Sequence, residues 1–362
     1  MDEIYEKLSG GKKISEALLF FSVNNFDNPE QGDLFFNSFG VGNNNSSWNK
    51  YERFICYEEL LKEIQTIDQN KYQKMHKGTA YYFLYWLAFE LRLYEKAIFY
   101  LDGAVSEDIR KTIKQAKREH PEQMERGDDE LRKFYEDIWS KNPAITDLCF
   151  KDGGTAVSVR LRIYAILKEQ IDRFNQLKIN GVPNIDVSKW GDNIVIPLLS
   201  KDIINRSLLS AFYSFLLSYA DNVDYLKLRS TNKGTIEPFL VHLYKGGLLF
   251  ETLLKYLSSK YNYTDTNGKH PTTLGQFNSR KNFTNKYSDF EARAESWNDV
   301  YQDIETNDIK GIFSTVARTR NFTGHDLRRD DDFSNEKYQK LVEREMDAMF
   351  IIIAKEFFYG IT

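Results

Sequence analysis

Apolar residues recur at helical spacing through most of this chain, and this pattern constrains its fold more than any other feature. We expect helices over residues 51–67, 78–93, 94–104, 155–177, 202–219, 237–259, 286–304, 309–321 and 336–358. Strand-like patterning is confined to the short run Ile194-Val195-Ile196. The chain has 7 prolines in 362 residues, where average usage gives about 18. Because proline breaks helix interiors, the sequence predicts an all-α protein.

Composition excludes several classes of function. The 49 Lys and Arg residues are balanced by 53 Asp and Glu residues, which excludes retention on nucleic acid by overall positive charge but leaves a local basic patch open. Cys56 and Cys149 are isolated, which argues against a disulfide scaffold or a cysteine-rich zinc site. No cofactor is expected. The acidic N-terminus and the short apolar runs predict a soluble, cytoplasmic chain without a signal peptide or membrane span.

A cluster of glycine and proline at 180–197 is the best candidate for an interdomain linker. It predicts a helical N-terminal domain over residues 1–195 and a helical bundle over residues 196–362. The role of the first domain is open, and only its position suggests a sensor, an antitoxin contact or a site for an activating ligand. The charged residues 106–141 predict a pair of solvated surface helices. Ser334 is a plausible N-cap for the last helix.

Part of the N-terminal domain has the spacing of a tetratricopeptide-type hairpin. The pattern consists of Tyr94, Ala97, Leu101 and Ala104, where small residues allow close helix approach. One such unit is present without a clear second copy, and a stable solenoid needs about three. The pattern therefore favours a packed helical hairpin over a repeat array. The glycine pairs Gly153-Gly154 and Gly246-Gly247 lack the lysine of a phosphate-binding loop and are assigned to turns or helix packing.

One segment carries recognisable chemistry. Its apolar positions follow the spacing of a single buried helix face: Ile309, Ile312, Phe313, Val316 and Ala317. The next position on that face is Arg320, and a charge there is costly unless it is paired. Gly324 suits a left-handed turn at the helix end, which would bring His325 beside Arg320.

An arginine and a histidine in one cleft suit phosphodiester cleavage. The guanidinium can hold two phosphate oxygens and stabilise the charge that grows on phosphorus. Imidazole can accept or donate a proton near neutral pH. RNA supplies its own nucleophile, the 2′-hydroxyl, so this chemistry needs no metal. The alternative interpretation of the segment is a helix C-terminus with surface charges.

Residues 320–325, Arg320-Asn321-Phe322-Thr323-Gly324-His325, resemble the R-x4-6-H motif of the HEPN superfamily. Glu251-Thr252-Leu253-Leu254-Lys255 is similar to the E-x3-K/R pattern of some members. The resemblance covers roughly residues 200–362. It implies a small all-α bundle of the kind found in metal-independent ribonucleases of toxin–antitoxin, abortive-infection and CRISPR-associated antiviral defence.

The resemblance also implies roles for individual residues. Arg320 would bind the scissile phosphate, His325 would be the acid–base, and Asn321 would orient the substrate or the histidine. Glu251 and Lys255 would form a supporting pair. Because the motif supplies one histidine per chain, we expect a homodimer through the C-terminal bundle, with both motifs near the twofold axis.

A second feature suggests contact with single-stranded RNA. The basic residues are Lys269, Arg280, Lys281 and Lys286, interleaved with Tyr261, Tyr263, Phe277 and Phe283. Cations for phosphates and rings for base stacking are typical of such surfaces. A basic loop without a ligand is the competing interpretation. For the whole chain, the rival to an endoribonuclease is a non-catalytic scaffold whose HEPN-like bundle only dimerises.

Overall fold

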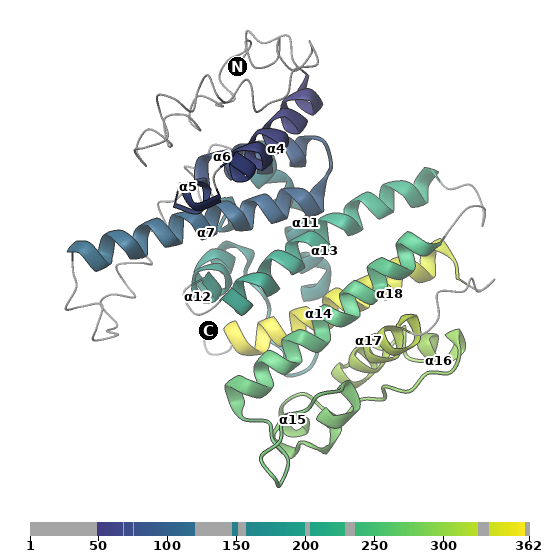
Figure 1. Ribbon diagram of the computed structural model, residues 1–362. Helices are drawn as coiled ribbons and strands as arrows, with labels where there is room; N and C mark the ends of the chain where they lie inside the picture. Colours follow the sequence, from purple (N-terminus) through teal and green to yellow (C-terminus); the bar gives the residue numbers. More distant parts are fainter. Residues whose placement is uncertain are drawn as a thin grey trace. The chain divides into compact units, whose positions relative to one another are not determined.

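The computed structural model describes residues 49–67, 69–74, 76–119, 147–150, 157–199, 203–228, 236–324 and 333–358 (Figure 1). Within these ranges every regular element is a helix and no strand occurs, which confirms the all-α prediction. None of the helices in this part of the chain is long and apolar enough to cross a membrane.

The chain divides into two compact units. The N-terminal unit comprises Met1–Arg162 and Val195–Arg206, and the C-terminal unit comprises Ile163–Ile194 and Ser207–Thr362. The division differs from a single boundary at 195, because residues 163–194 belong to the C-terminal unit.

The N-terminal unit is built around a helical hairpin. Its helices are α4 (Lys50–Ile67), α5 (Gln69–Lys74), α6 (Gly78–Glu90), α7 (Tyr94–Glu119) and the short α12 (Ile196–Leu199). Helices α6 and α7 pack together, and Ala97, Leu101 and Ala104 are buried. The predicted hairpin is confirmed, and the repeat array, which the sequence pattern disfavoured, is not tested. Helix α7 continues to Glu119, so the first part of the charged stretch extends this helix, and residues 120–141 lie outside the described residues.

The predicted linker is a packed part of the molecule up to residue 194. Asn175 lies near the end of α11 (Val157–Gln176). Its side chain bonds the backbone N–H and C=O of Ile185 at 3.0 and 2.9 Å. Trp190 is fully buried and donates its indole N–H to the Tyr213 hydroxyl at 2.8 Å. Two short helical turns flank Trp190, η1 (Val187–Lys189) and η2 (Gly191–Val195). The strand-like run at 194–196 is helical, at the end of η2 and the start of α12, because a short apolar run fits either structure.

Three helices position the candidate site in the C-terminal unit. Helices α14 (Glu237–Tyr261), α17 (Ile309–Thr323) and α18 (Asn335–Phe357) pack pairwise against one another (Figure 1). Most of α11 and of α13 (Ile203–Leu228) also belongs to this unit. The predicted apolar stripe of α17 is buried from Ile312 to Ala317. Ser334 caps α18 as predicted, since its hydroxyl accepts the Lys337 backbone N–H at 3.1 Å.

The helix predicted over 286–304 is wrong. The structure has α15 (Lys281–Lys286) and α16 (Trp297–Tyr301), joined by a non-helical segment over 287–296. The Asn278 side chain, from the short helix η3 (Leu274–Ser279), bonds the backbone N–H and C=O of Phe290 at 3.0 and 2.5 Å. Phe290 and Ala292 are buried while Asp289, Glu291 and Arg293 are exposed, and this alternation with a period of two is typical of extended backbone.

Candidate active site

The position of Arg320 depends on a glycine in α14. A Cβ atom added at Gly247 would lie 2.4 Å from the Arg320 Cβ, so α14 and α17 approach too closely here for any side chain. This contact places Arg320 beside the next turn of α14, which carries Glu251. The assignment of Gly246-Gly247 to helix packing is confirmed, and Gly153-Gly154 lies outside the described residues.

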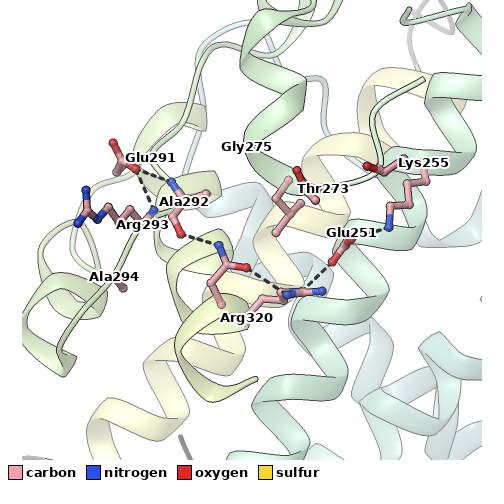
Figure 2. A pocket seen from close by; sticks show the side chains of 12 residues that line it. Glu251, Lys255, Thr273, Gly275, Glu291, Ala292, Arg293, Ala294 and Arg320 are labelled. Atoms are coloured by element: carbon pink, nitrogen blue, oxygen red, sulfur yellow. Dashed lines mark hydrogen bonds and ion pairs between the residues drawn. The ribbon is translucent and has the colours of Figure 1, made fainter. Parts of the chain in front are cut away.

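Arg320 and Lys255 share one buried carboxylate. Arg320 Nε lies 2.7 Å from Glu251 Oε2, and Lys255 Nζ lies 2.5 Å from Glu251 Oε1 (Figure 2). The Nε–H bond is not aimed at its oxygen, so the Arg320–Glu251 contact is an ion pair rather than a hydrogen bond. The Glu251 side chain is 6% exposed and that of Arg320 is 25% exposed. The arginine that ends the apolar stripe is therefore paired, as a half-buried charge must be.

Asn321 fixes the arginine from the other side. Arg320 Nη1 donates to Asn321 Oδ1 at 3.2 Å, and Asn321 Nδ2 donates to the carbonyl oxygen of Ala292 at 2.6 Å. Both contacts fit one orientation of the amide, with oxygen towards the arginine and nitrogen towards the carbonyl. Through these two contacts Asn321 holds the Arg320 guanidinium in one orientation. Its predicted action on a histidine or a substrate stays a prediction.

These residues line a pocket of about 760 Å³. Its walls come from α14, α17, the loop into η3 and the segment after α15: Glu251, Lys255, Thr272, Thr273, Leu274, Gly275, Glu291, Ala292, Arg293, Ala294, Arg320 and Asn321. The volume lies in the range of small-molecule sites. No aromatic side chain is among these twelve residues. The structure thus brings four of the predicted site residues, Arg320, Asn321, Glu251 and Lys255, into one pocket.

His325 lies outside the described residues, so its position relative to Arg320 stays untested. The left-handed turn predicted at Gly324 is wrong, because its φ and ψ are −72° and −14°, in the right-handed helical region. The space around Gly324 is nevertheless tight. An added Cβ would lie 3.0 Å from Tyr244 Cε2 and from the Arg320 carbonyl oxygen.

The predicted RNA-binding cations do not line the pocket. Arg280 is buried, donates to Ser279 Oγ at 2.7 Å and lies 3.8 Å from Asp265 Oδ2. Lys286 pairs with the buried Glu356 at 2.5 Å. Arg280 and Lys286 therefore have structural partners.

Two of the predicted cations, Lys269 and Lys281, are exposed. Three of the interleaved rings, Tyr263, Phe277 and Phe283, are buried and cannot stack on bases. These three rings pack in the aromatic core, and this packing explains why aromatic residues alternate with basic residues in this part of the sequence. Of the four rings only Tyr261 is exposed, and the ammonium groups of Lys260 and Lys286 lie over it at 4.8 and 4.3 Å.

Sequence reasoning missed a buried acid behind the site. Glu345, in α18, is 0% exposed, and neither of its carboxyl oxygens has a hydrogen-bond partner among the described residues. Burial raises the pKa of Glu345 well above its usual range, which favours the neutral acid. Its carboxyl group occupies the space that a side chain at Gly246 would fill, since an added Cβ would lie 2.1 Å from Oε2.

Comparison with protein-family models, with curated proteins and with solved structures found no match. Across the described ranges, no group of three or more His, Cys, Asp or Glu residues is arranged to hold a metal ion. The HEPN resemblance therefore depends on the motif residues and on the pocket that they line.

Proposed function

We propose that the protein is a metal-independent endoribonuclease of HEPN type. In this reaction the RNA 2′-hydroxyl attacks the adjacent phosphorus, the bond from phosphorus to the 5′-oxygen breaks, and a 2′,3′-cyclic phosphate forms. His325 takes the hydroxyl proton or supplies a proton to the leaving oxygen. Arg320 stabilises the negative charge that develops on the phosphate oxygens.

The observation that carries the proposal is the way in which Arg320 is held. Nε contacts Glu251 and Nη1 contacts Asn321, whereas Nη2 has no partner among the described residues. A guanidinium held on two sides presents its remaining donors to a ligand at little cost in entropy. The adjacent Lys255 adds a second positive charge for a phosphate.

Assembly into a twofold dimer is part of the proposal. Cleavage needs a base for the 2′-hydroxyl and an acid for the leaving oxygen. Two copies of the R-x4-H motif at one interface supply two histidines. Light scattering at micromolar concentration should give the mass of a dimer, and a monomer that cleaves at full rate contradicts this part.

The central experiment is cleavage of mixed single-stranded RNA in EDTA. Wild-type protein should produce fragments with 2′,3′-cyclic phosphate ends. Arg320→Ala and His325→Ala should each lower the rate by about 10²-fold or more. Arg320→Lys should also fail, because lysine keeps the charge but lacks the planar fork of donors.

Matched controls keep the result specific. His270→Ala removes a histidine that contacts Ser258 Oγ at 3.0 Å and lies outside the pocket. Arg110→Ala removes an exposed arginine of the N-terminal unit. Both controls should cleave at the wild-type rate. Loss of cleavage in EDTA, or unchanged cleavage by His325→Ala, contradicts the assignment. Absence of RNA cleavage by wild-type protein both with and without EDTA favours the non-catalytic scaffold.

A further inference from the structure

The pocket contains a carboxylate that the proposed reaction does not use. Glu291 Oε1 accepts the backbone N–H groups of Ala292 and Arg293, both at 2.9 Å. The side chain makes no ion pair with any described residue, and Oε2 has no partner among them. Two backbone bonds therefore fix an acceptor at the pocket wall and leave one oxygen available.

The charges in the pocket are unevenly distributed. In Figure 2, Glu291 and Lys255 lie on opposite sides, with Arg320 between them. Lys255 and Arg320 attract a phosphate, whereas the Glu291 carboxylate repels one. Arg293 also lines the Glu291 side, but its guanidinium is paired with Glu295, Nη2 to Oε1 at 2.5 Å. A nucleotide in this pocket is therefore oriented with its phosphate towards Arg320 and its base towards Glu291.

An ionised carboxylate only accepts hydrogen bonds. Adenine, cytosine and guanine carry an exocyclic amino group that can donate to it. Uracil has no amino group, and its one ring N–H lies between two carbonyl oxygens that a carboxylate repels. Because no aromatic ring is among the described residues that line the pocket, base stacking on these residues cannot override this difference.

We infer that Glu291 is a specificity-determining residue that accepts a hydrogen bond from the amino group of a base and disfavours uridine. The inference rests on the proposed function, since it takes RNA as the ligand. A site that accepts a hydrogen bond from one donor group of its ligand discriminates strongly against an analogue that lacks this donor group.

Binding of 2′-fluoro oligonucleotides tests the inference separately from cleavage, because these probes lack the attacking hydroxyl. Fluorescence anisotropy would compare labelled hexamers of cytidine and uridine, two pyrimidines of similar size. Wild-type protein should bind the cytidine hexamer at least tenfold more tightly. Glu291→Gln should reduce the ratio to threefold or less, because an amide can also donate to a uracil carbonyl. Its Oε1 can still accept both backbone N–H groups, which preserves the fold.

Glu295→Gln is the matched control. Glu295 is exposed, pairs with Arg293 and is not a pocket residue, so this variant should keep the wild-type ratio. Equal binding of both hexamers by wild-type protein, or an unchanged ratio in Glu291→Gln, overturns the inference even if RNA is cleaved. Conversely, a Glu291-dependent preference without cleavage supports this inference and refutes the nuclease proposal.

Discussion

Glu345→Gln should change how the stability of the C-terminal unit depends on pH. The wild-type carboxyl is fully buried without a hydrogen-bond partner among the described residues, and burial raises its pKa well above its usual range. In the unfolded chain a glutamate has a pKa of about 4.3. Between that value and the folded pKa, unfolding releases a proton. Rising pH therefore destabilises the wild-type protein by about 1.4 kcal/mol per pH unit.

Glutamine has nearly the same shape and does not titrate, so Glu345→Gln should lack this slope. Urea unfolding at pH 5 to 8, followed by tryptophan fluorescence, measures the free energy of unfolding of each protein. The fully buried Trp190 reports on the C-terminal unit. The neighbouring groups that can titrate, Tyr338 and its partner His242, are present in both proteins. The difference between the two curves therefore isolates Glu345.

The wild-type protein should lose stability relative to Glu345→Gln as the pH rises from about 5. If the free energies of unfolding of the two proteins follow parallel curves across this pH range, the reasoning is refuted, because Glu345 then titrates alike in the folded and unfolded states. A slope of the opposite sign would show that the folded protein stabilises the ionised carboxylate.

Three further substitutions test the structure. Asp347→Ala removes the buried carboxylate that Arg344 contacts at 3.1 Å, so urea unfolding should show a loss of about 3–5 kcal/mol. Gly275→Leu adds a side chain where a Cβ meets no atom within 4 Å, so stability should be unchanged while anisotropy shows RNA binding weakened at least tenfold. Gly247→Ala forces α17 away from α14, so urea unfolding should show a free energy of unfolding that is lower by about 1–3 kcal/mol. The same substitution should lower the rate of RNA cleavage, because it displaces Arg320.

The sequence predicted the elements with strong periodicity. Helices α4, α11, α14, α17 and α18 lie within a few residues of their expected bounds, because apolar residues recur at helical spacing in each. Periodicity pointed to Arg320 in the helical half of the pocket, whereas Glu251 and Lys255 came from the resemblance to the E-x3-K/R pattern. Arg320 interrupts an apolar stripe, and Glu251 and Lys255 are four residues apart on one helix.

The other half of the pocket could not be predicted. Glu291 and Gly275 reach it on non-helical segments whose course depends on the bonds between Asn278 and Phe290, twelve residues apart. Such bonds leave no periodic signal in the sequence. Gly324 shows a related limit, because its backbone angles are right-handed and the tight contact at this position is with Tyr244 of α14, which the local sequence does not reveal.

The adjacent glycines of α14 have a consequence for how this chain can vary in evolution. Gly246 leaves room for Glu345 of α18, and Gly247 leaves room for Arg320 of α17. An alanine at 246 would meet Glu345 Oε2 at 2.1 Å and Phe215 Cε2 at 2.7 Å, so it requires a smaller residue 345 and a shift of Phe215. An alanine at 247 requires α17 to move. In an alignment of related chains, position 246 should therefore covary with 345, whereas 247 should stay glycine wherever an arginine occupies position 320.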